Sequence, residues 1–258
     1  MKNSLLTAVA LSALSATATA DYQFDVTGSY QNDASEVNNT DIDFGGLSLE
    51  ANYYLRPVST AAGILAESAF LDKASYVGVR YHQRELEVDG GIFSSHKVSA
   101  DNFGFHGRFV AEGQNDIIVE ADLAFGDSDD IGVAGGFYLN NQTEILFGIL
   151  DSDIADTTIY VDGKTLIDSY GNNAIIAEGR IQINDGDLGV QAEGDLYLNG
   201  YTSVGARVGL YLEDDTRLAM IGKADYFVTD QLAVGGELGL YSVFDAGIGF
   251  KLFVTGRF

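Results

Sequence analysis

The sequence predicts an all-β fold, namely a transmembrane antiparallel up-and-down β-barrel. The chain of 258 residues contains 31 Gly, 14 Tyr and 15 Phe but a single Pro. This composition favours strands and tight turns. Apolar and polar residues alternate along most of the chain, and the connections between the alternating runs fall into two chemically different classes.

The C-terminal stretch "FDAGIGFKLFVTGRF" shows the alternation most clearly. Ile248, Phe250 and Leu252 fall on one face, whereas Lys251 and Arg257 fall on the other. Side chains of a β-strand point alternately to opposite faces, so this run predicts a strand with one apolar and one polar face.

Similar runs recur through the chain, and most are about nine to eleven residues long, the length that a tilted strand needs to cross a bilayer. We expect fourteen strands, near residues 22–31, 42–55, 75–85, 102–110, 116–125, 131–139, 144–150, 157–166, 174–183, 188–198, 202–212, 217–226, 231–241 and 245–258. Twelve strands are the alternative, because Asp162-Gly163 within "TTIYVDGKTL" could form a hairpin turn inside a surface loop.

The connections between strands are of two kinds. Short turns follow aromatic and aliphatic residues in "YYLRP", "FYLNNQT", "LYLNGYT" and "DYFVTDQ". The alternate connections are acidic, as in "GDSDD" at 126–130, "DSDIAD" at 151–156, "NDGD" at 184–187 and "EDD" at 213–215. The repeats indicate that one hairpin end recurs, and they place Tyr and Phe where an aromatic girdle is expected.

The two faces of the strands decide between lipid and water as surroundings. Charged residues lie on nearly every polar face, whereas the apolar faces are uninterrupted by charge. A closed barrel in lipid requires apolar side chains outside, polar side chains inside and no unpaired sheet edge. A soluble β-sandwich or lipocalin-like barrel is the alternative.

The first twenty residues are expected to be a cleaved secretory signal peptide. Lys2 is followed by an apolar stretch and by the small-x-small motif Ala18-Thr19-Ala20. Residues 21–258 would form one barrel domain. Within it, residues 58–75 break the alternation and are expected to form a periplasmic connector with a short helix. The chain lacks Cys, and its net charge of −24 is unfavourable for nucleic-acid binding. No cofactor or metal is expected.

Charged residues on the inward face are the candidate functional residues. The expected pore-lining set is Arg80, Arg84, Arg108, Glu120, Asp122, Glu178, Arg180, Glu193, Asp195, Arg207, Lys223, Glu237 and Lys251. The nearly balanced charges predict a transverse field across the lumen. The alternative is that these residues pair across neighbouring strands and simply fill it. Acidic outer loops would concentrate cations and so favour cation passage.

The chain resembles Gram-negative outer-membrane porins in its twin-faced strands and its C-terminal Phe258. More narrowly, "AAGILAESAFLDKASYVGVRY" resembles a segment that follows the first hairpin in a "putative porin" group. Residues 66–75 carry this likeness, including Glu67, Phe70 and Lys73. The resemblance implies outer-membrane lipid and lipopolysaccharide as surroundings, and it implies that the barrel-assembly machinery reads Phe258. A homo-oligomer is a further possibility, and the surface loops are too short to suggest a long inward-folding loop.

The sequence leaves three classes of function to compare. The first is a water-filled channel in the outer membrane of a Gram-negative bacterium for passive diffusion of small hydrophilic solutes and ions. The second is a structural barrel without an open pore. The third is an outer-membrane hydrolase, for which only His82, His96 and His106 could act as imidazole bases. No nucleophile–base motif accompanies them, so we expect no enzymatic activity.

Overall fold

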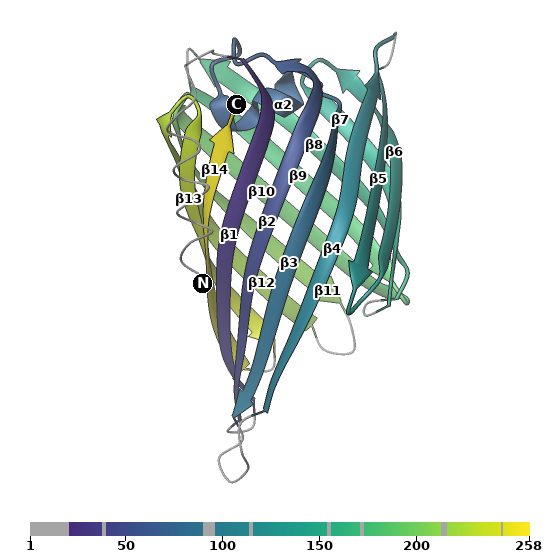
Figure 1. Ribbon diagram of the computed structural model, residues 1–258, viewed down its shortest axis with the longest axis vertical. Helices are drawn as coiled ribbons and strands as arrows, with labels where there is room; N and C mark the ends of the chain where they lie inside the picture. Colours follow the sequence, from purple (N-terminus) through teal and green to yellow (C-terminus); the bar gives the residue numbers. More distant parts are fainter. Residues whose placement is uncertain are drawn as a thin grey trace.

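The structure is a computed structural model that describes residues 21–37, 40–89, 96–113, 116–153, 156–170, 173–212, 216–243 and 245–258. Its strands form one closed barrel in which every strand pairs with its neighbours in sequence, and β1 closes the sheet against β14 (Figure 1). All pairings between neighbouring strands are antiparallel. No helix among the described residues is long and apolar enough to cross a bilayer.

The strands follow one another in simple up-and-down order. Their bounds are β1 Tyr22–Val37, β2 Thr40–Val58, β3 Tyr76–Asp89, β4 His96–Ala111, β5 Ile117–Gly126, β6 Asp130–Asn140, β7 Thr143–Ser152, β8 Thr158–Tyr170, β9 Asn173–Asn184, β10 Asp187–Asn199, β11 Thr202–Leu212, β12 Thr216–Thr229, β13 Leu232–Val243 and β14 Asp245–Arg257. Two short helical turns, η1 Leu65–Glu67 and α2 Ser68–Leu71, lie between β2 and β3.

This topology confirms the predicted fourteen-stranded barrel and excludes the twelve-stranded alternative. The deciding segment is β8, which pairs with both neighbours. Gly163, the residue that could have marked a hairpin turn, lies opposite Ile145 of β7 and Gly179 of β9. The dipeptide Asp162-Gly163 is therefore part of a continuous ladder.

The two faces are oriented as predicted for lipid. On β14, Phe250 and Leu252 are 40% and 57% exposed on the outer surface, whereas Arg257 is 7% exposed inside the barrel. The other strands repeat this arrangement, so the large exposed side chains are mostly apolar. Exposing so large an apolar surface to water would be unfavourable. This face is therefore suited to contact with hydrocarbon.

The two classes of turn lie at opposite ends of the barrel. The start of β1, the end of β14, the helical turns and the connections that follow β2, β6, β10 and β12 share one end, which we call the terminal end (Figure 1). The acidic connections follow β5, β7 and β9 at the other end. Among them, Asp185 and Gly186 have φ values of 47° and 95° and join β9 to β10 as a two-residue turn. Positive φ at both positions is typical of a type I′ hairpin.

Three two-residue turns at the terminal end share one local device. A side-chain oxygen accepts a hydrogen bond from the backbone N–H two residues further on: Asn140 Oδ1 accepts from Gln142 at 2.7 Å, and Asn199 Oδ1 accepts from Tyr201 at 2.8 Å. Thr229 accepts similarly from Gln231. A bulge precedes each turn. The recurring local chemistry explains why these turns look alike in the sequence.

The outward direction of the apolar face can be tested at Leu238, which is 58% exposed near the middle of β13. Replacing Leu238 with Arg should lower the free energy of unfolding by about 2–4 kcal/mol, since an Arg facing the bilayer midplane is poorly solvated. Leu238→Met is the matched control and should change little. Reversible denaturant unfolding in lipid vesicles measures both variants, and equal stability of the two would contradict the assigned face.

Candidate functional site: the lumen and its plug

The segment between β2 and β3 enters the barrel instead of bridging the two strands along the rim. We call residues 59–75 the plug. It contains η1 and α2, and Figure 1 shows these turns inside the wall at the terminal end. Ile64 and Leu65 are buried, as are Glu67 and Ser68. The sequence predicted a connector with a short helix over residues 58–75 and no long inward-folding surface loop, and in the structure the connector itself turns inward.

The aromatic residues before the short turns form the socket for this plug. In each repeat one side chain faces lipid and its neighbour faces inward, as with exposed Tyr53 and buried Tyr54. The inward members are Tyr54, Tyr138, Tyr197 and Phe227, and each is at most 5% exposed. The sequence-based assignment of the whole repeat to an aromatic girdle was therefore only half correct. The inward partners line the barrel end.

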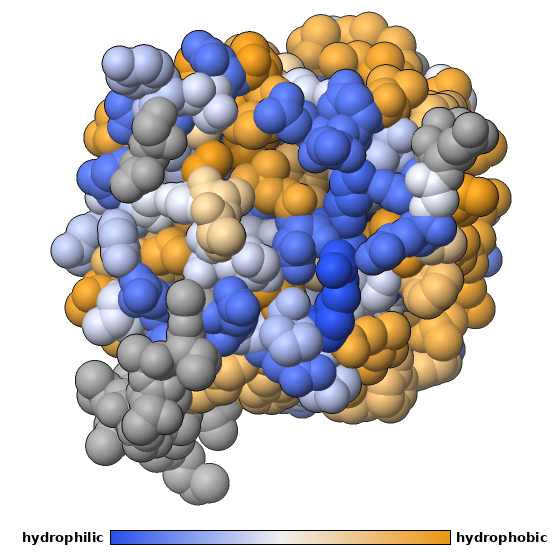
Figure 2. Space-filling model, turned by 90° about the horizontal axis from the view of Figure 1, so that it is seen from above, coloured by the Kyte–Doolittle hydropathy of each residue, from blue (hydrophilic) through white to orange (hydrophobic). Residues whose placement is uncertain are grey.

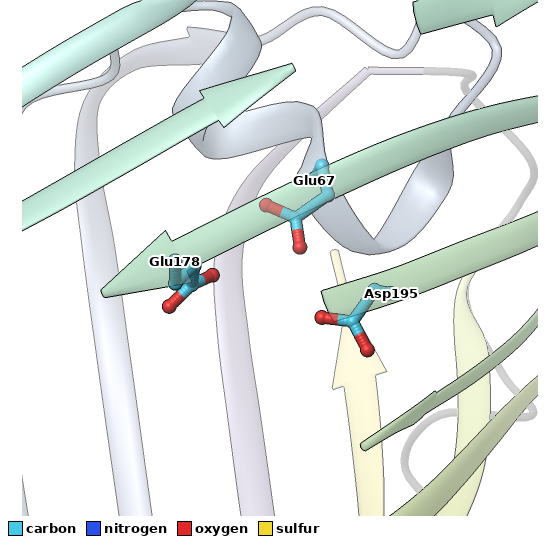
Figure 3. Close-up of side chains that lie close together, drawn as sticks. All are labelled: Glu67, Glu178 and Asp195. Carbon is cyan, nitrogen blue, oxygen red and sulfur yellow. The ribbon is translucent and has the colours of Figure 1, made fainter. Parts of the chain in front are cut away.

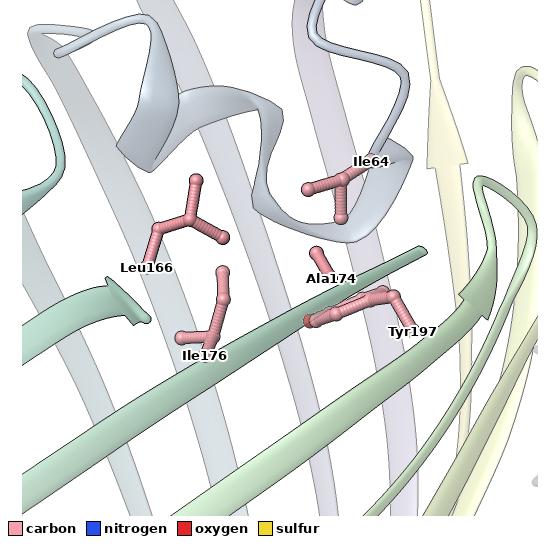
Figure 4. Packing of buried hydrophobic residues seen from close by; sticks show 5 residues of the cluster. All are labelled: Ile64, Leu166, Ala174, Ile176 and Tyr197. Atoms are coloured by element: carbon pink, nitrogen blue, oxygen red, sulfur yellow. The ribbon is translucent and has the colours of Figure 1, made fainter. Parts of the chain in front are cut away.

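Apolar side chains of the plug pack against this socket at several points around the wall. Ile64 lies among Leu166, Ala174, Ile176 and Tyr197, as Figure 4 shows. The other contacts involve further strands. Leu65 packs with Phe227 and Ala233, Phe70 packs with Val110, Ile118, Tyr138 and Leu146, and Ala69 packs with Tyr22, Tyr54, Val58 and Ala74.

Polar contacts hold the plug in register with the socket. Glu67 accepts a hydrogen bond from the Tyr197 hydroxyl at 2.7 Å and pairs with Lys164 Nζ at 2.7 Å. Arg257 donates to the Leu65 carbonyl at 2.6 Å, and its guanidinium lies over the rings of Tyr22 and Phe227. Strands β8, β10 and β14 therefore each contribute a polar anchor.

The packing makes the plug a fixed element of this barrel. Complete burial of a Leu or Ile side chain contributes about 1.5–3 kcal/mol. The burial of Ile64 and Leu65 together therefore stabilises the docked plug by several times the thermal energy RT. Removing Glu67 from Lys164 would also leave a buried carboxylate without its cation, which is costly. Viewed along the barrel axis from the terminal end, side chains cover much of the mouth (Figure 2).

Beyond the plug, the structure places the predicted pore-lining residues on the inner face of the wall. Most of them form ion pairs between strands. Those pairs are Arg80–Asp122, Arg108–Glu120, Arg108–Glu144, Lys164–Glu178, Arg180–Asp162, Arg207–Glu193, Lys223–Glu193 and Lys223–Asp195. The alternative considered from the sequence, pairing across strands, therefore describes much of the wall.

Arg108 is the most heavily engaged of these residues. Its guanidinium donates to Glu120 at 2.8 Å and to the Tyr138 hydroxyl at 3.0 Å, and it also pairs with Glu144. Tyr138 lies against Phe70 of the plug. This chain of contacts connects the charged lumen directly to the plug.

Three carboxylates converge where the plug meets the wall, namely Glu67 of the plug with Glu178 of β9 and Asp195 of β10 (Figure 3). Carboxylates in such proximity could in principle bind a cation. Lysines already supply the positive charge here, because Lys164 lies 2.7 and 2.6 Å from Glu67 and Glu178. Lys223 lies 2.8 Å from Asp195. The cluster is therefore a network of internal ion pairs.

Two polar cavities remain in the lumen next to these networks. One of about 310 Å³ is lined by residues such as Lys164, Glu178 and Arg207, and a second of about 430 Å³ is lined by residues such as Glu50, Arg80 and His106. Arg180 lines both cavities. Cavities of this size and polarity hold water and small polar solutes rather than apolar ligands.

The remaining members of the predicted set are arranged differently. Glu237 and Lys251 lie directly opposite each other on β13 and β14. Arg84 is exposed and has no ion-pair partner among the described residues. His106 donates from Nε2 to Asn52 Oδ1 at 2.7 Å, since the Asn52 amide nitrogen donates to carboxylates elsewhere. This histidine belongs to a polar wall network.

Sequence reasoning missed several residues that matter here. Glu144 occupies an inward position and could have been added from the alternation alone. Glu67 and the socket residues could not have been identified in this way, because nothing local in the sequence reveals that the plug turns inward. Phe258, the expected assembly signal, exchanges backbone hydrogen bonds with Phe24 where the barrel closes.

Lys73 anchors the last part of the plug to the connections at the terminal end. Its Nζ lies 2.5 Å from Asp116 Oδ2, and the Gly113 backbone N–H donates to Asp116 Oδ1 at 2.9 Å. The Lys73 ammonium, together with that N–H, holds the pKa of Asp116 below its usual range. The stabilising contribution of this carboxylate is therefore present above pH about 3.9 and is lost as the pH falls through its lower folded-state pKa.

Replacing Lys73 with Met should raise the pKa of Asp116 toward its ordinary value, because the nearest positive charge is removed. A side-chain NMR titration of labelled aspartate measures this shift. Lys97→Met removes a lysine at the opposite end and serves as the control. An unchanged Asp116 pKa in the Lys73 variant would show that the ion pair does not form.

The closed barrel, its lipid-facing apolar surface and its charged lumen define an outer-membrane channel protein of the porin class. The family described as "Putative general bacterial porin" matches residues 1–150. Because the match covers more than half of the chain, this protein belongs to that family. Among curated proteins, no match was found.

Solved structures show the same fold. The outer membrane protein Omp33 of Acinetobacter baumannii superposes with a TM-score of 0.71 at 20% sequence identity, covering 92% of this chain and 99% of Omp33. OprB of Pseudomonas putida gives a TM-score of 0.54 at 9% identity and covers 93% of each chain. The translocator domain of the autotransporter NalP from Neisseria meningitidis gives 0.51 at 10% identity, covering 100% of this chain and 95% of the other.

Proposed function

We propose that this porin conducts small hydrophilic solutes and ions through a narrow, polar lumen, and that the plug sets its size limit. The observation that carries the proposal is the contrast between two zones of the inner wall. The middle zone is charged and contains the two polar cavities, whereas the terminal end is lined largely by apolar and aromatic side chains and is filled by the plug. Passage must therefore be limited at the plug.

The proposed setting follows from the chemistry of the two ends. Short turns and both termini are typical of the periplasmic side, and longer loops of the outer surface. The terminal end would then face the periplasm, after export and cleavage of residues 1–20, which lie outside the described residues. The acidic end would face lipopolysaccharide. The barrel-assembly machinery would recognise the last strand with Phe258, and assembly as a homo-oligomer is compatible with this arrangement.

Loosening the plug tests its role as the constriction. Leu65→Ala combined with Glu67→Gln removes one buried contact and the ion pair to Lys164. Because a less firmly held plug leaves a wider passage, we expect single-channel conductance to increase by about twofold or more. Planar bilayer recording measures it.

The matched control is Glu178→Gln, which removes the other carboxylate partner of Lys164 but leaves the plug contacts intact. It should change conductance much less than the double variant. Equal conductance of the wild type and the double variant would place the constriction elsewhere in the lumen.

A structural barrel without an open pore is the second candidate, and one observation favours it. The plug is packed from several sides and anchored by Arg257, so no simple hinge would release it. The double variant also separates these functions. Under the structural alternative the wild type carries no current, and only the loosened variant conducts.

Cation preference is proposed from the charges at the acidic end. Asp127, Asp129, Asp151 and Asp153 are exposed around that mouth. Their combined potential raises the local cation concentration and lowers that of anions.

Under a KCl gradient, the unmodified channel should show a zero-current potential shifted toward the K⁺ equilibrium potential. Replacing these four aspartates with Asn should reduce that shift, because the negative charge at the mouth is removed. The shift should shrink as salt concentration rises, because salt screens exposed charges. Anion selectivity of the unmodified channel would contradict the proposal.

We propose no enzymatic activity, since His106 is held in a polar wall network with Asn52 and Glu50, and among the described residues no hydrogen bond joins His82 to a nucleophile. Absence of esterase and protease activity in the refolded protein is the expected result, with His82→Ala as the control for any activity that is found.

A further inference from the structure

The strands β1 to β4 carry a second zone in which the apolar and polar faces are exchanged. In β2, Leu47 and Leu49 face outward in the membrane-facing part, but Ile42 and Phe44 occupy the inward positions nearer the acidic end. The exchange occurs at Gly45-Gly46, and the register is continuous across it. It is therefore a feature of the sequence and not of a bulge.

The neighbouring strands show the same exchange at the same height. Phe44 pairs with Leu86 of β3, which in turn pairs with Val98 of β4. Ile42 and Val88 form the next row. We call Ile42, Phe44, Leu86, Val88 and Val98 the apolar mouth wall, because their positions in the alternation place them on the side of the lumen.

Outer-face residues at this height are polar, which shows that the wall stands above the lipid. Asp43, Glu87 and Lys97 are exposed there, and Lys97 pairs with Glu85 at 2.9 Å. Water outside accounts for these charges. It does not account for apolar side chains on the inside, where a water-filled mouth would favour polar residues.

The apolar mouth wall is accessible because β1 to β4 project beyond the strands beside them (Figure 1). Pairing of β4 with β5 ends at Asn102 and Gly126 among the described residues. Consistent with this projection, Leu86 is 38% exposed and Val98 is 61% exposed.

An unpaired cation lies directly below the wall. Arg84 precedes Leu86 on the inner face of β3, and its lateral neighbours are Gly46 and Ala100, neither of which reaches over the guanidinium. Arg84 is exposed and lacks an ion-pair partner among the described residues, unlike Arg80, Arg108, Arg180 and Arg207 deeper in the lumen. The carboxylate of Asp33 on β1 instead accepts a hydrogen bond from Gln31 at 2.5 Å.

We propose that the apolar mouth wall and Arg84 form a docking site for a small carboxylate with an apolar body, such as an aromatic or branched aliphatic acid. The guanidinium would bind the carboxylate through two parallel N–H donors, and the apolar body would lie against Leu86 and Val98. The positive charge of Arg84 favours an anionic ligand, because a neutral apolar ligand would make no use of the guanidinium N–H donors. The site would be a local exception at the acidic end, where the exposed aspartates lower the overall anion concentration, and it rests on the channel proposed above for its role.

Benzoate binding to the protein in lipid nanodiscs tests the site without requiring conduction. Saturation-transfer NMR should show saturable binding of benzoate, with much weaker binding of acetate and of benzamide. Arg84→Gln should weaken benzoate binding by about tenfold or more, because the charge-assisted hydrogen bonds are lost. Arg84→Lys should retain part of it, since the charge remains but the fork geometry does not.

Val98→Asn should also weaken benzoate binding while leaving the weak acetate signal unchanged, whereas Lys97→Gln on the outer face should have no effect. Thermal unfolding confirms that each variant is folded. Equal binding of acetate and benzoate, or full binding by the Arg84→Gln variant, would overturn the proposal. So would the absence of saturable binding, as expected if lipid or a second copy of the chain covers the wall. KCl conductance, measured separately, tests the channel itself.

Discussion

The fold depends on one constraint, which is that a strand cannot leave its backbone N–H and C=O groups unpaired in hydrocarbon. A sheet in lipid must therefore close, and here the closure lies between β1 and β14. Asp25 pairs with Arg257 and Gly28 with Val254 along this seam. The Phe258 backbone completes it through hydrogen bonds with Gln23 and Phe24. Once the sheet is closed, strand alternation separates a lipid-facing surface from an enclosed lumen, and the other features follow from how that lumen is filled.

The lumen is filled in zones, each with its own chemistry. Ion pairs between strands, some adjacent and some further apart around the barrel, satisfy most charges of the middle zone, so that few carboxylates are left alone in a confined space. At the terminal end the inward positions become apolar, because Ile118, Leu146 and Ile176 receive the plug there. Arg257 connects the two requirements, as it lies on the closing strand and binds the plug backbone. Barrel closure and plug docking thus share one residue.

The sequence was sufficient to predict the barrel, its fourteen strands and the inward charges, because each depends on the period-two alternation of neighbouring residues. It could not predict the plug. Whether residues 59–75 turn inward depends on contacts with strands more than one hundred residues away, such as Tyr197 with Glu67. The aromatic repeats could be seen in the sequence. That one residue of each repeat faces lipid while its neighbour contacts the plug became clear only from the position of the plug. The exchange of the apolar and polar faces at Gly45-Gly46 can be seen in "TDIDFGGLSLE". That the exchanged residues of neighbouring strands lie side by side could be known only from the register of the strands.

The central claim is that the apolar face of each strand contacts hydrocarbon and that the polar face encloses water. Because the chain contains no Cys, single cysteines can be placed along β13 from Gly236 to Leu240 and labelled with nitroxide spin probes in lipid vesicles. Accessibility to oxygen, which concentrates in lipid, should be high at 238 and 240 and low at 237 and 239, with the opposite pattern for a water-soluble nickel complex. Equal accessibility at consecutive positions, or the reverse alternation, would contradict this account.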